Sequence, residues 1–335
     1  MSDILTKTTK KLLTYTKGIL ASDEGINSAN RNLAKIGVEG TEKTRRAYRE
    51  LFINTPRFEK YVSGVILCDE TFWQEDSNGK AFRKTLKEKD VVLIVKVDEG
   101  LTEFSGNSEE KTTKGVEGLA DRLPKYFEAG ARATKWRTVF SVGKELPTDD
   151  LIETNTETLA KYALICQQNN IVPIVEPEVL YKGDHSFAQA QTVTGKVLKK
   201  TFDKLKEHDV NLREVILKTS MVLPGKSSGE DATPSQISTA TIKVLRESVP
   251  NEVPGVVFLS GGQEPMQATI NLDAIATAND TTHFATFSFL RAIEGPAAET
   301  WAGKEKNVTK AREVFLKKLE LDSLASQGML ETAQW

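Results

Sequence analysis

Eight short apolar runs recur along the chain, separated by longer amphipathic stretches, and this alternation constrains the fold more than any other feature. Apolar runs rich in Val, Ile, Leu and Phe are typical of strands in a parallel sheet, which are buried on both faces. Their alternation with helical patterns indicates repeated strand–helix units. In chain order the runs are GILAS ending at Ser22, GVILC ending at Cys68, VVLIVKV ending at Val97, ARATKW ending at Trp136, IVPIV, REVILK, GVVFLS and FATFSF.

The stretches between the runs have helical patterns, as in TEKTRRAYRELFIN and VEGLADRLPKYFEAG. Thr41 and Thr148 are suitable N-caps, Gly130 is a suitable helix stop, and His208 suits a helix end. Because eight parallel strands can close on themselves, the pattern predicts an α/β fold of the TIM (β/α)8 barrel type. We expect residues 1–335 to form a single barrel domain with an N-terminal helical segment and a short C-terminal tail.

Composition narrows the classes of function. The chain has 335 residues, of which 39% are hydrophobic and 27% charged, and its net charge is -2. No dense basic block is present to neutralise phosphates, so we expect no nucleic-acid partner. No apolar run approaches the roughly 18 residues of a membrane helix, and the N-terminus does not read as a secretory signal, so we expect a cytoplasmic protein without a membrane partner. Cys68 and Cys166 lie in apolar settings and are expected to be buried and reduced.

A barrel carries its active site at the carboxyl ends of its strands, so the polar residues that follow each run are the candidates. Any one of them alone could be a solvated loop charge. Together they would crowd opposite charges into one pocket, where desolvation must be balanced by pairing or by use in chemistry. The candidates are Asp23, Asp69 with Glu70, Lys96, Lys135 with Arg137, Glu176 with Glu178, Lys218, Ser260, and Ser288 with Arg291.

Lys218 lies in ILKTSMVLPG, at the end of an apolar run. Loss of hydration there disfavours the ammonium form, and a free amine attacks carbonyl carbon. A second inward cation, Lys135, would reinforce this effect, with each ammonium making the other less favourable. Glu176 could relay protons if burial moved its pKa towards neutrality. Asp23 could hold a second proton-transfer position, or it could be a helix N-cap in ASDEGINS. For Lys218 alone, a strand-end lysine that extends its charge to water is the simpler reading.

Phosphate binding has separate signals. FLSGGQE places Ser260 and two glycines between a strand and a helix, where backbone N–H groups can face an anion. Arg291 follows the eighth run, and barrels often bind phosphate at the loops after strands seven and eight. Lys96 and Arg137 would lie on the opposite side of a closed barrel and offer a second anion site, unless both simply pair with neighbouring carboxylates. The pattern indicates a substrate with phosphate at both ends.

Metal and nucleotide cofactors have no evident anchor. His185, His208 and His283 are scattered without ligand spacing, and neither GxGxxG nor a Walker motif is present. We expect no metal site and no cofactor.

Over nearly its whole length the chain resembles the class I, Schiff-base-forming fructose-1,6-bisphosphate aldolases. The resemblance implies metal-independent, reversible cleavage of fructose 1,6-bisphosphate to dihydroxyacetone phosphate and glyceraldehyde 3-phosphate in glycolysis and gluconeogenesis. It also implies a cytoplasmic homotetramer. It rests on GILASDEG, GVEGTEKTRRAYRELF, GVILCDET, VKVDEGL, GLADRLPKYFEAGARATKWR, ICQQNNIVPIVEPEVL, ILKTSMVLPG, VPGVVFLSGGQE and SFSFLRA.

Carried over position by position, the resemblance makes Lys218 the Schiff-base lysine and Glu176 the general acid/base. Lys135 and Asp23 match the remaining catalytic positions, and Glu178 matches a supporting carboxylate. The resemblance also implies contacts to the two substrate phosphates. One phosphate would be bound by Ser260, Gly261 and Arg291, and the other by Lys96, Arg137 and Ser28.

The chain departs from the family pattern at Leu290, at Gly25–Ile26, at Thr219–Ser220, at Glu99, and at its end at Trp335, where many members continue to a functional tyrosine. Two alternatives stay open at this point. The same lysine chemistry could act on fructose 1-phosphate or sedoheptulose 1,7-bisphosphate. A non-catalytic barrel that binds protein partners is the other alternative, although such a scaffold needs none of the four catalytic residues.

Overall fold

All eight apolar runs form strands in a computed structural model, which describes residues 3–330. The strands join into one eight-stranded sheet in which each neighbouring pair is parallel. In sheet order they are β1 (Gly18–Ser22), β2 (Val62–Leu67), β3 (Val92–Lys96), β6 (Ala133–Phe140), β7 (Val172–Val179), β8 (Ile216–Thr219), β9 (Gly255–Phe258) and β10 (Phe284–Phe287).

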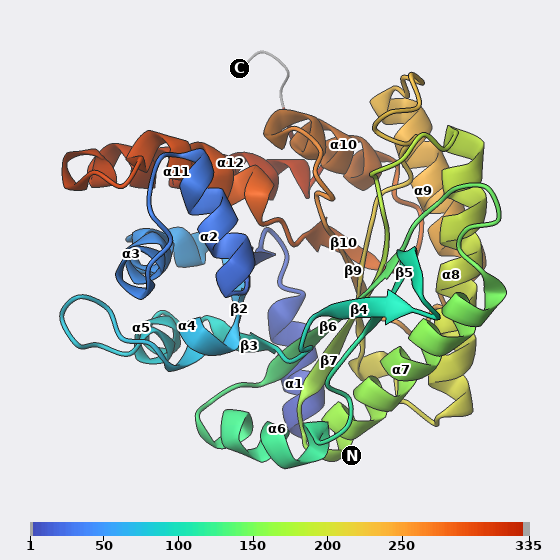
Figure 1. The fold of residues 1–335 in the computed structure, drawn as a ribbon, viewed down its shortest axis with the longest axis horizontal. Helices are drawn as coiled ribbons and strands as arrows, with labels where there is room; N and C mark the ends of the chain where they lie inside the picture. Colours follow the sequence, from blue (N-terminus) through green and yellow to red (C-terminus); the bar gives the residue numbers. More distant parts are fainter. Residues whose placement is uncertain (1–2, 331–335) are drawn as a thin grey trace.

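The sheet curves into a nearly closed barrel (Figure 1). The first and last strands meet beside each other. The Ala21 N–H donates to the Phe289 carbonyl at 3.1 Å, and the Thr286 hydroxyl donates to the Lys17 carbonyl at 3.1 Å. The predicted TIM-barrel fold is confirmed.

Helices surround the barrel; most of them connect successive strands, and the last ones follow β10 (Figure 1). They are α2 (Ile26–Lys35), α3 (Glu42–Ile53), α4 (Asp69–Trp73), α5 (Phe82–Glu88), α6 (Leu119–Glu128), α7 (Asp149–Gln168), α8 (Phe187–Glu207), α9 (Pro234–Ser248), α10 (Pro265–Ala278), α11 (Arg291–Trp301) and α12 (Val308–Ala325), with short 3-10 turns η1 (Phe58–Lys60), η2 (Leu212–Glu214) and η3 (Glu305–Asn307).

The helix boundaries follow the expected chemistry. The Thr41 hydroxyl accepts from the Thr44 N–H at the start of α3, and the Thr148 hydroxyl accepts from the Leu151 N–H at the start of α7, both at 3.2 Å. Gly130 follows α6 with a φ of 106°, a conformation that costs glycine little. His208 is the C-cap of α8. All four expectations are confirmed.

An additional helix, α1 (Asp3–Leu12), lies at the amino end of the barrel. Leu5 and Leu12 are buried in a cluster with the side chains that fill the barrel interior, including Ile66 and Ile94. The approach is close enough that a Cβ on Gly64 would lie 2.6 Å from a Leu12 methyl carbon. The N-terminal helical segment therefore closes one end of the barrel and leaves the opposite end for the site.

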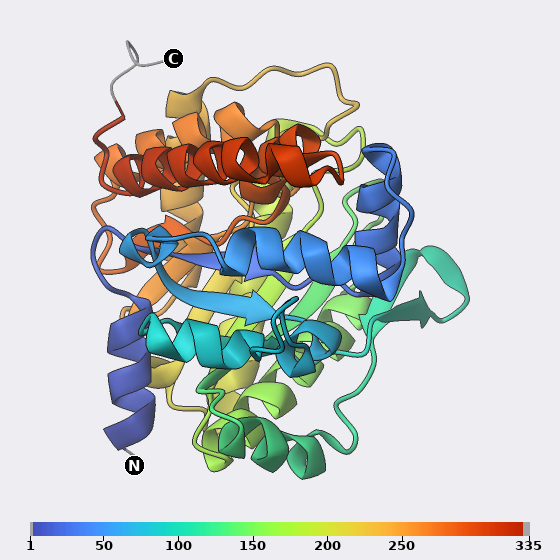
Figure 2. The same cartoon turned by 90° about the vertical axis from the view of Figure 1, so that its left-hand side faces the viewer.

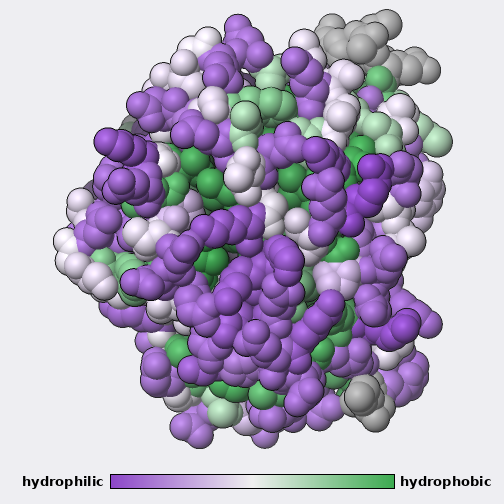
Figure 3. Space-filling model, turned by 90° about the vertical axis from the view of Figure 1, so that its right-hand side faces the viewer, coloured by the Kyte–Doolittle hydropathy of each residue, from purple (hydrophilic) through white to green (hydrophobic). Residues whose placement is uncertain are grey.

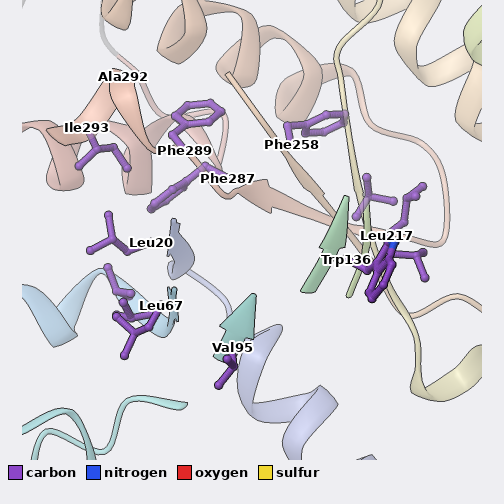
Figure 4. Packing of buried hydrophobic residues seen from close by; sticks show 14 of the residues in the cluster. Leu20, Leu67, Val95, Trp136, Leu217, Phe258, Phe287, Phe289, Ala292 and Ile293 are labelled. Atoms are coloured by element: carbon purple, nitrogen blue, oxygen red, sulfur yellow. The ribbon is translucent and has the colours of Figure 1, made fainter. Parts of the chain in front are cut away.

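The strand alternation separates two apolar cores, because successive side chains of a strand point to opposite faces. The inner core fills the barrel, and a larger outer core joins the strands to the helices. Figure 4 shows part of the outer core, with side chains from successive strands and from α11: Leu20, Leu67, Val95, Trp136, Leu217, Phe258, Phe287, Phe289, Ala292 and Ile293.

An antiparallel hairpin, β4 (Leu101–Phe104) and β5 (Asn107–Thr113), follows β3 and was not foreseen from the sequence. Most of its residues are half-buried or exposed, so it contains no apolar run that would have indicated a strand. The hairpin and α1 lie at opposite ends of the barrel (Figure 2). It therefore belongs to the end at which the strands finish.

The surface over α7, α8 and α9 is mainly hydrophilic, with hydrophobic residues scattered among polar ones (Figure 3). Within residues 3–330, no helix combines the length and the apolar character needed to cross a membrane. Cys68 and Cys166 are buried free thiols, as expected.

Candidate active site

A cavity of about 960 Å³ opens at the carboxyl ends of the strands. Every residue that the sequence analysis assigned to catalysis or to phosphate binding lines it. The catalytic candidates are Asp23, Lys135, Glu176, Glu178 and Lys218, and the phosphate candidates are Ser28, Lys96, Arg137, Ser260, Gly261 and Arg291.

Strand periodicity explains why the charged side chains face inward. Ile216 lies in the barrel interior, so Lys218, two residues further along β8, points the same way. The same spacing in β6 relates Ala133 to Lys135. In β7 it relates Ile174 to Glu176. These charged side chains therefore lie one layer beyond the apolar interior of the barrel and line the floor of the cavity.

Four of the catalytic candidates form a continuous ionic chain. Lys135 Nζ lies 2.7 Å from Asp23 Oδ2 and 2.9 Å from Glu176 Oε2. Lys218 Nζ lies 3.2 Å from Glu176 Oε1. Lys135, Glu176 and Lys218 are only 2%, 4% and 3% exposed. Because the shared carboxylate of Glu176 lies between both ammonium groups, a change of charge on Lys218 acts directly on Glu176.

These ion pairs determine the direction in which the pKa values of Asp23 and Glu176 are shifted. Burial would raise the pKa of Asp23, but Lys135 and Lys218 outweigh burial and hold that pKa well below its usual range. Burial would also raise the pKa of Glu176, and the same two lysines bring it below its ordinary value. The expectation that burial moves the pKa of Glu176 towards neutrality is therefore wrong.

For Lys135 the outcome also differs from the expectation. Burial would lower the pKa of its ammonium, but the charges of Asp23 and Glu176 raise it well above the ordinary value. A neighbouring cation does not make Lys135 less basic, because two carboxylates lie closer to it. Lys135 is therefore a permanent cation in this pocket.

Asp23 is not a helix cap. It lies between the end of β1 at Ser22 and the start of α2 at Ile26, and the N-cap of α2 is Gly25, which makes no side-chain cap hydrogen bond. Of the two readings that the sequence left open for Asp23, the structure supports the one in which the side chain faces the cavity.

The residues predicted to bind one phosphate lie around the turn after β9. Gly261 and Gly262 have φ values of 60° and 99°, a backbone region that favours glycine, and α10 follows them. Arg291 is the first residue of α11, immediately across from this turn: a Cβ on Gly262 would lie 3.4 Å from its Nη2. This arrangement brings Ser260, Gly261 and Arg291 together as predicted.

Lys96 and Arg137 lie on the other side of the barrel. They belong to β3 and β6, which are third and fourth in the ring order, whereas β9 and β10 are seventh and eighth. Lys96 Nζ is 2.7 Å from Asp98 Oδ1, and Arg137 forms an ion pair with Glu178. Lys96 and Arg137 therefore pair with carboxylates and also line the cavity. The sequence left open whether they form an anion site or only pair with carboxylates, and these two possibilities do not exclude each other.

Ser28 lies on α2 at the cavity wall and accepts a hydrogen bond from Arg31 Nη2 at 2.9 Å. Arg31 was missed by the sequence analysis, as were Glu24 and Asp98, although all three line the cavity. Glu24 and Asp98 each follow a strand, so the strand-end criterion could have found them. Arg31 lies inside a helix, where no signal separates it from a solvated charge.

Across residues 3–330, no group of three or more His, Cys, Asp or Glu side chains is arranged to hold a metal ion.

A nearly closed barrel with a buried lysine and a shared carboxylate at its carboxyl end, flanked by cationic side chains on both sides of the cavity, is typical of one class of protein. That class comprises barrel enzymes that use an amine on phosphorylated carbonyl compounds.

Comparison with known proteins narrows the class. The family model described as fructose-bisphosphate aldolase class-I matches residues 4–334. The chain is 44% identical to cytosolic fructose-bisphosphate aldolase 4 of Arabidopsis thaliana, over 93% of this chain and 80% of that one. It is 44% identical to human fructose-bisphosphate aldolase C, over 94% of this chain and 87% of the relative.

A solved structure agrees with these relatives. The fructose-bisphosphate aldolase of Plasmodium falciparum, determined in complex with TRAP and a small-molecule inhibitor, superposes with a TM-score of 0.96 at 41% identity, covering 98% of this chain and 95% of that chain. The chain therefore belongs to the class-I fructose-bisphosphate aldolase family. Its activity is that of a glycolytic aldolase, a lyase that acts on a sugar phosphate.

Proposed function

We propose that Lys218 is the amine that forms the Schiff base with carbon 2 of fructose 1,6-bisphosphate. The observation that carries this proposal is the position of Lys218 Nζ, 3.2 Å from Glu176 Oε1 at the buried end of the cavity. Glu176 can take a proton from the ammonium and so provide the free amine. The cavity lies between two cationic sites that suit a substrate with phosphate at each end.

In the first step the amine of Lys218 adds to the carbon-2 ketone, and a nitrogen–carbon bond forms. The proton released by nitrogen moves to the former ketone oxygen. Glu176 then donates a proton to that oxygen, and water leaves to give a protonated imine. The imine cation attracts electrons from the neighbouring carbon–carbon bond and thereby prepares it for cleavage.

In the second step Asp23 accepts the proton of the carbon-4 hydroxyl. The bond between carbons 3 and 4 breaks, carbon 4 becomes the aldehyde of glyceraldehyde 3-phosphate, and the electron pair forms an enamine. Lys135, whose charge is fixed by its carboxylates, stabilises negative charge near the reacting oxygen. Protonation at carbon 3 and hydrolysis of the imine then release dihydroxyacetone phosphate and free Lys218.

The two anion sites supply orientation. Ser260, Gly261 and Arg291 bind one phosphate, while Lys96, Arg137 and Ser28 bind the other. Contacts at both ends convert binding energy remote from the reaction into correct placement of the ketone above Lys218. Glu178 supports this arrangement by holding Arg137.

Substrate preference follows from the same geometry. Fructose 1-phosphate fills only one anion site, whereas sedoheptulose 1,7-bisphosphate has phosphates separated by one more carbon. We propose that fructose 1,6-bisphosphate is preferred, because it alone among the three has two phosphates at the spacing of a six-carbon sugar. Cleavage rates with the three sugars, compared at equal concentration, measure this preference.

The Schiff base can be tested by trapping. Borohydride reduction in the presence of fructose 1,6-bisphosphate should leave a covalent adduct on the peptide that contains Lys218, and activity should persist in EDTA. Lys218→Ala should abolish both the adduct and turnover, and Glu176→Gln should slow formation and hydrolysis of the imine by roughly 100-fold. Mass spectrometry and a coupled cleavage assay measure these effects.

A matched control is Lys226→Ala, which removes an exposed lysine a short distance along the chain and should change neither result. Cleavage that proceeds in wild type without a trapped adduct, or with an adduct on another lysine, contradicts the proposal. The absence of both cleavage and adduct in wild type favours the non-catalytic scaffold instead.

Two further expectations concern the cell and the assembly. We propose a cytoplasmic location, supported by relatives that are named cytosolic or cytoplasmic. We also propose a homotetramer, which is supported by the family resemblance alone. Cell fractionation and analytical ultracentrifugation measure these two properties.

A further inference from the structure

A buried cluster of ionisable side chains lies next to the end of β1, and one of its members, Glu24, also lines the catalytic cavity. Its centre is Arg49 of α3, whose side chain is 2% exposed. Arg49 Nη1 lies 3.4 Å from Glu294 Oε2 on α11, and Nη2 lies 3.7 Å from Glu24 Oε2. The side chain of Glu294 is 0% exposed, and Tyr48 donates a hydrogen bond to its Oε2 at 3.0 Å. Burying this many ionisable groups costs free energy unless they are paired.

The guanidinium of Arg49 also holds the chain on both sides of Asp23. Nη1 donates to the Ser22 hydroxyl at 3.2 Å, and Nη2 donates to the main-chain carbonyl of Glu24 at 3.0 Å. Asp23 lies beyond the last residue of β1, so the parallel ladder with β2 does not extend to it. The two Arg49 contacts therefore anchor a turn that the sheet itself does not hold.

The position of this turn determines the distance between Asp23 and Lys135. That distance is 2.7 Å, a contact that a small movement of the turn would break. Glu294, three residues after Arg291 on the same helix, accepts from the same Nη1 that donates to Ser22. Arg49 thus connects the Asp23 turn with the helix that begins at the phosphate candidate Arg291.

We propose that Arg49 is a positioning residue for carbon–carbon cleavage, which holds the turn that carries Asp23 so that its carboxylate meets Lys135 and the carbon-4 hydroxyl. The inference rests on the proposed role of Asp23 in that step. Arg49 does not touch substrate under this proposal, and its effect passes through Asp23. An alternative is that Arg49 merely holds α3 against the barrel.

The test compares Arg49→Met with Arg45→Met. Arg45 lies one turn earlier on α3 and forms an ion pair with Glu70 and a hydrogen bond with Asn30, so its loss is a matched change on the same helix. Arg49→Met should slow single-turnover cleavage by roughly 30- to 100-fold, because misplacing a reacting group by about 1 Å has an effect of this size. Arg45→Met should leave the cleavage rate within about twofold of wild type.

Trapping separates the two steps. Because Asp23 is not assigned to imine formation, Arg49→Met should still give the Lys218 adduct with borohydride at the wild-type level. A loss of adduct in Arg49→Met that parallels the loss of cleavage overturns the inference while leaving the Schiff base of the wild type intact. A wild type without adduct overturns the proposed function itself.

A double-mutant cycle tests the route through Asp23. In an Asp23→Asn background, Arg49→Met should lower the cleavage rate less than about threefold further, because the group that it positions is already disabled. An equal loss in both backgrounds overturns the inference. So does a cleavage rate that Asp23→Asn leaves unchanged.

Arg49→Lys is a control for loss of folding in Arg49→Met. An ammonium keeps the buried charge but cannot reproduce the planar fork that reaches Ser22 and Glu24 together. We expect Arg49→Lys to retain the wild-type circular dichroism spectrum and the Lys218 adduct while cleavage stays slowed by roughly 10-fold or more. Full recovery of cleavage in Arg49→Lys would show that charge alone matters and would overturn the positioning role.

Discussion

At the scale of the residue, Glu176 couples the acid–base chemistry of the site to the charge of Lys218. Its two carboxylate oxygens face different lysines, with Lys218 at 3.2 Å and Lys135 at 2.9 Å. Burial opposes its ionisation, and the two ammonium groups hold its pKa down. In the proposed reaction Glu176 takes the proton of the Lys218 ammonium. The neutral amine no longer holds the pKa of Glu176 down, so Glu176 can keep this proton until it donates it to the departing oxygen.

Glu294 gives a prediction about stability and pH. Burial raises the pKa of Glu294 from 4.5 to about 8, although Arg49 opposes the change. Between these values the folded protein holds a proton that the unfolded chain releases, so this group lowers stability as pH rises through the window. Glutamine does not ionise. The free energy of unfolding of Glu294→Gln, measured by urea unfolding and compared with that of wild type, should therefore show a larger gain at about pH 8 than at about pH 5.5.

The control for this measurement is Glu299→Gln on the same helix, which has an exposed side chain and should show a much smaller change with pH. An offset between Glu294→Gln and wild type that is the same at both pH values would contradict the prediction.

The candidate site was predictable from the sequence to the extent that its residues lie at strand ends. Lys218, Glu176 and Asp23 each follow or finish an apolar run, so the barrel hypothesis alone brought them together. Arg49 was not predictable in this way. Its contacts with Ser22 and Glu294 are 27 and 245 positions away in sequence, so local periodicity carries no information about them.

At the scale of the element, β6 and β7 differ from the other strands. Each has eight residues, whereas the apolar runs suggested that they end near Trp136 and Val175. The predicted ends are too early because a charged residue follows each apolar run, Arg137 after Trp136 and Glu176 after Val175. Those charges point into the cavity, where Lys135 meets Glu176 and Arg137 meets Glu178. The longer strands thus build one wall of the site.

The start of α8 provides a test of element stability. The Ser186 hydroxyl accepts from the Gln189 N–H at 3.2 Å, and Gln189 Oε1 accepts from the Ser186 N–H at 2.8 Å. Ser186→Ala should cost about 1 kcal/mol, the usual effect of losing an N-cap. We expect a thermal midpoint about 2 °C lower and an unchanged kcat, measured by calorimetry and the cleavage assay. A lower kcat at unchanged Tm would mean that this cap serves the site and not the helix.

At the scale of the whole molecule, the ring closes where β1 meets β10. Gly18 lies at this junction, and a Cβ there would lie 2.5 Å from ring carbons of Phe287. Both residues are held by the surrounding core, since Phe287 is fully buried. Close approach of the two strands therefore depends on the absence of a side chain at Gly18.

Gly18→Ala should accordingly destabilise the barrel by about 1–3 kcal/mol, the range for overpacking a dense core. Gly295→Ala is the matched control, because a Cβ at Gly295 has no heavy atom within 4 Å and the residue lies inside α11. That change should be neutral or stabilise by about 0.5–1 kcal/mol. Chemical denaturation measures both, and equal stability of the two variants would contradict the role of Gly18.

The junction between β1 and β10 also relates the integrity of the ring to occupancy of the site. Asp23 follows one of these strands and Arg291 follows the other, so a sugar bisphosphate that contacted both would span the place where the sheet meets itself. Ligand binding and ring closure would then favour each other reciprocally, by mass action. An aldolase saturated with its sugar would gain resistance to heat, and heat that loosened the ring would in turn release the sugar.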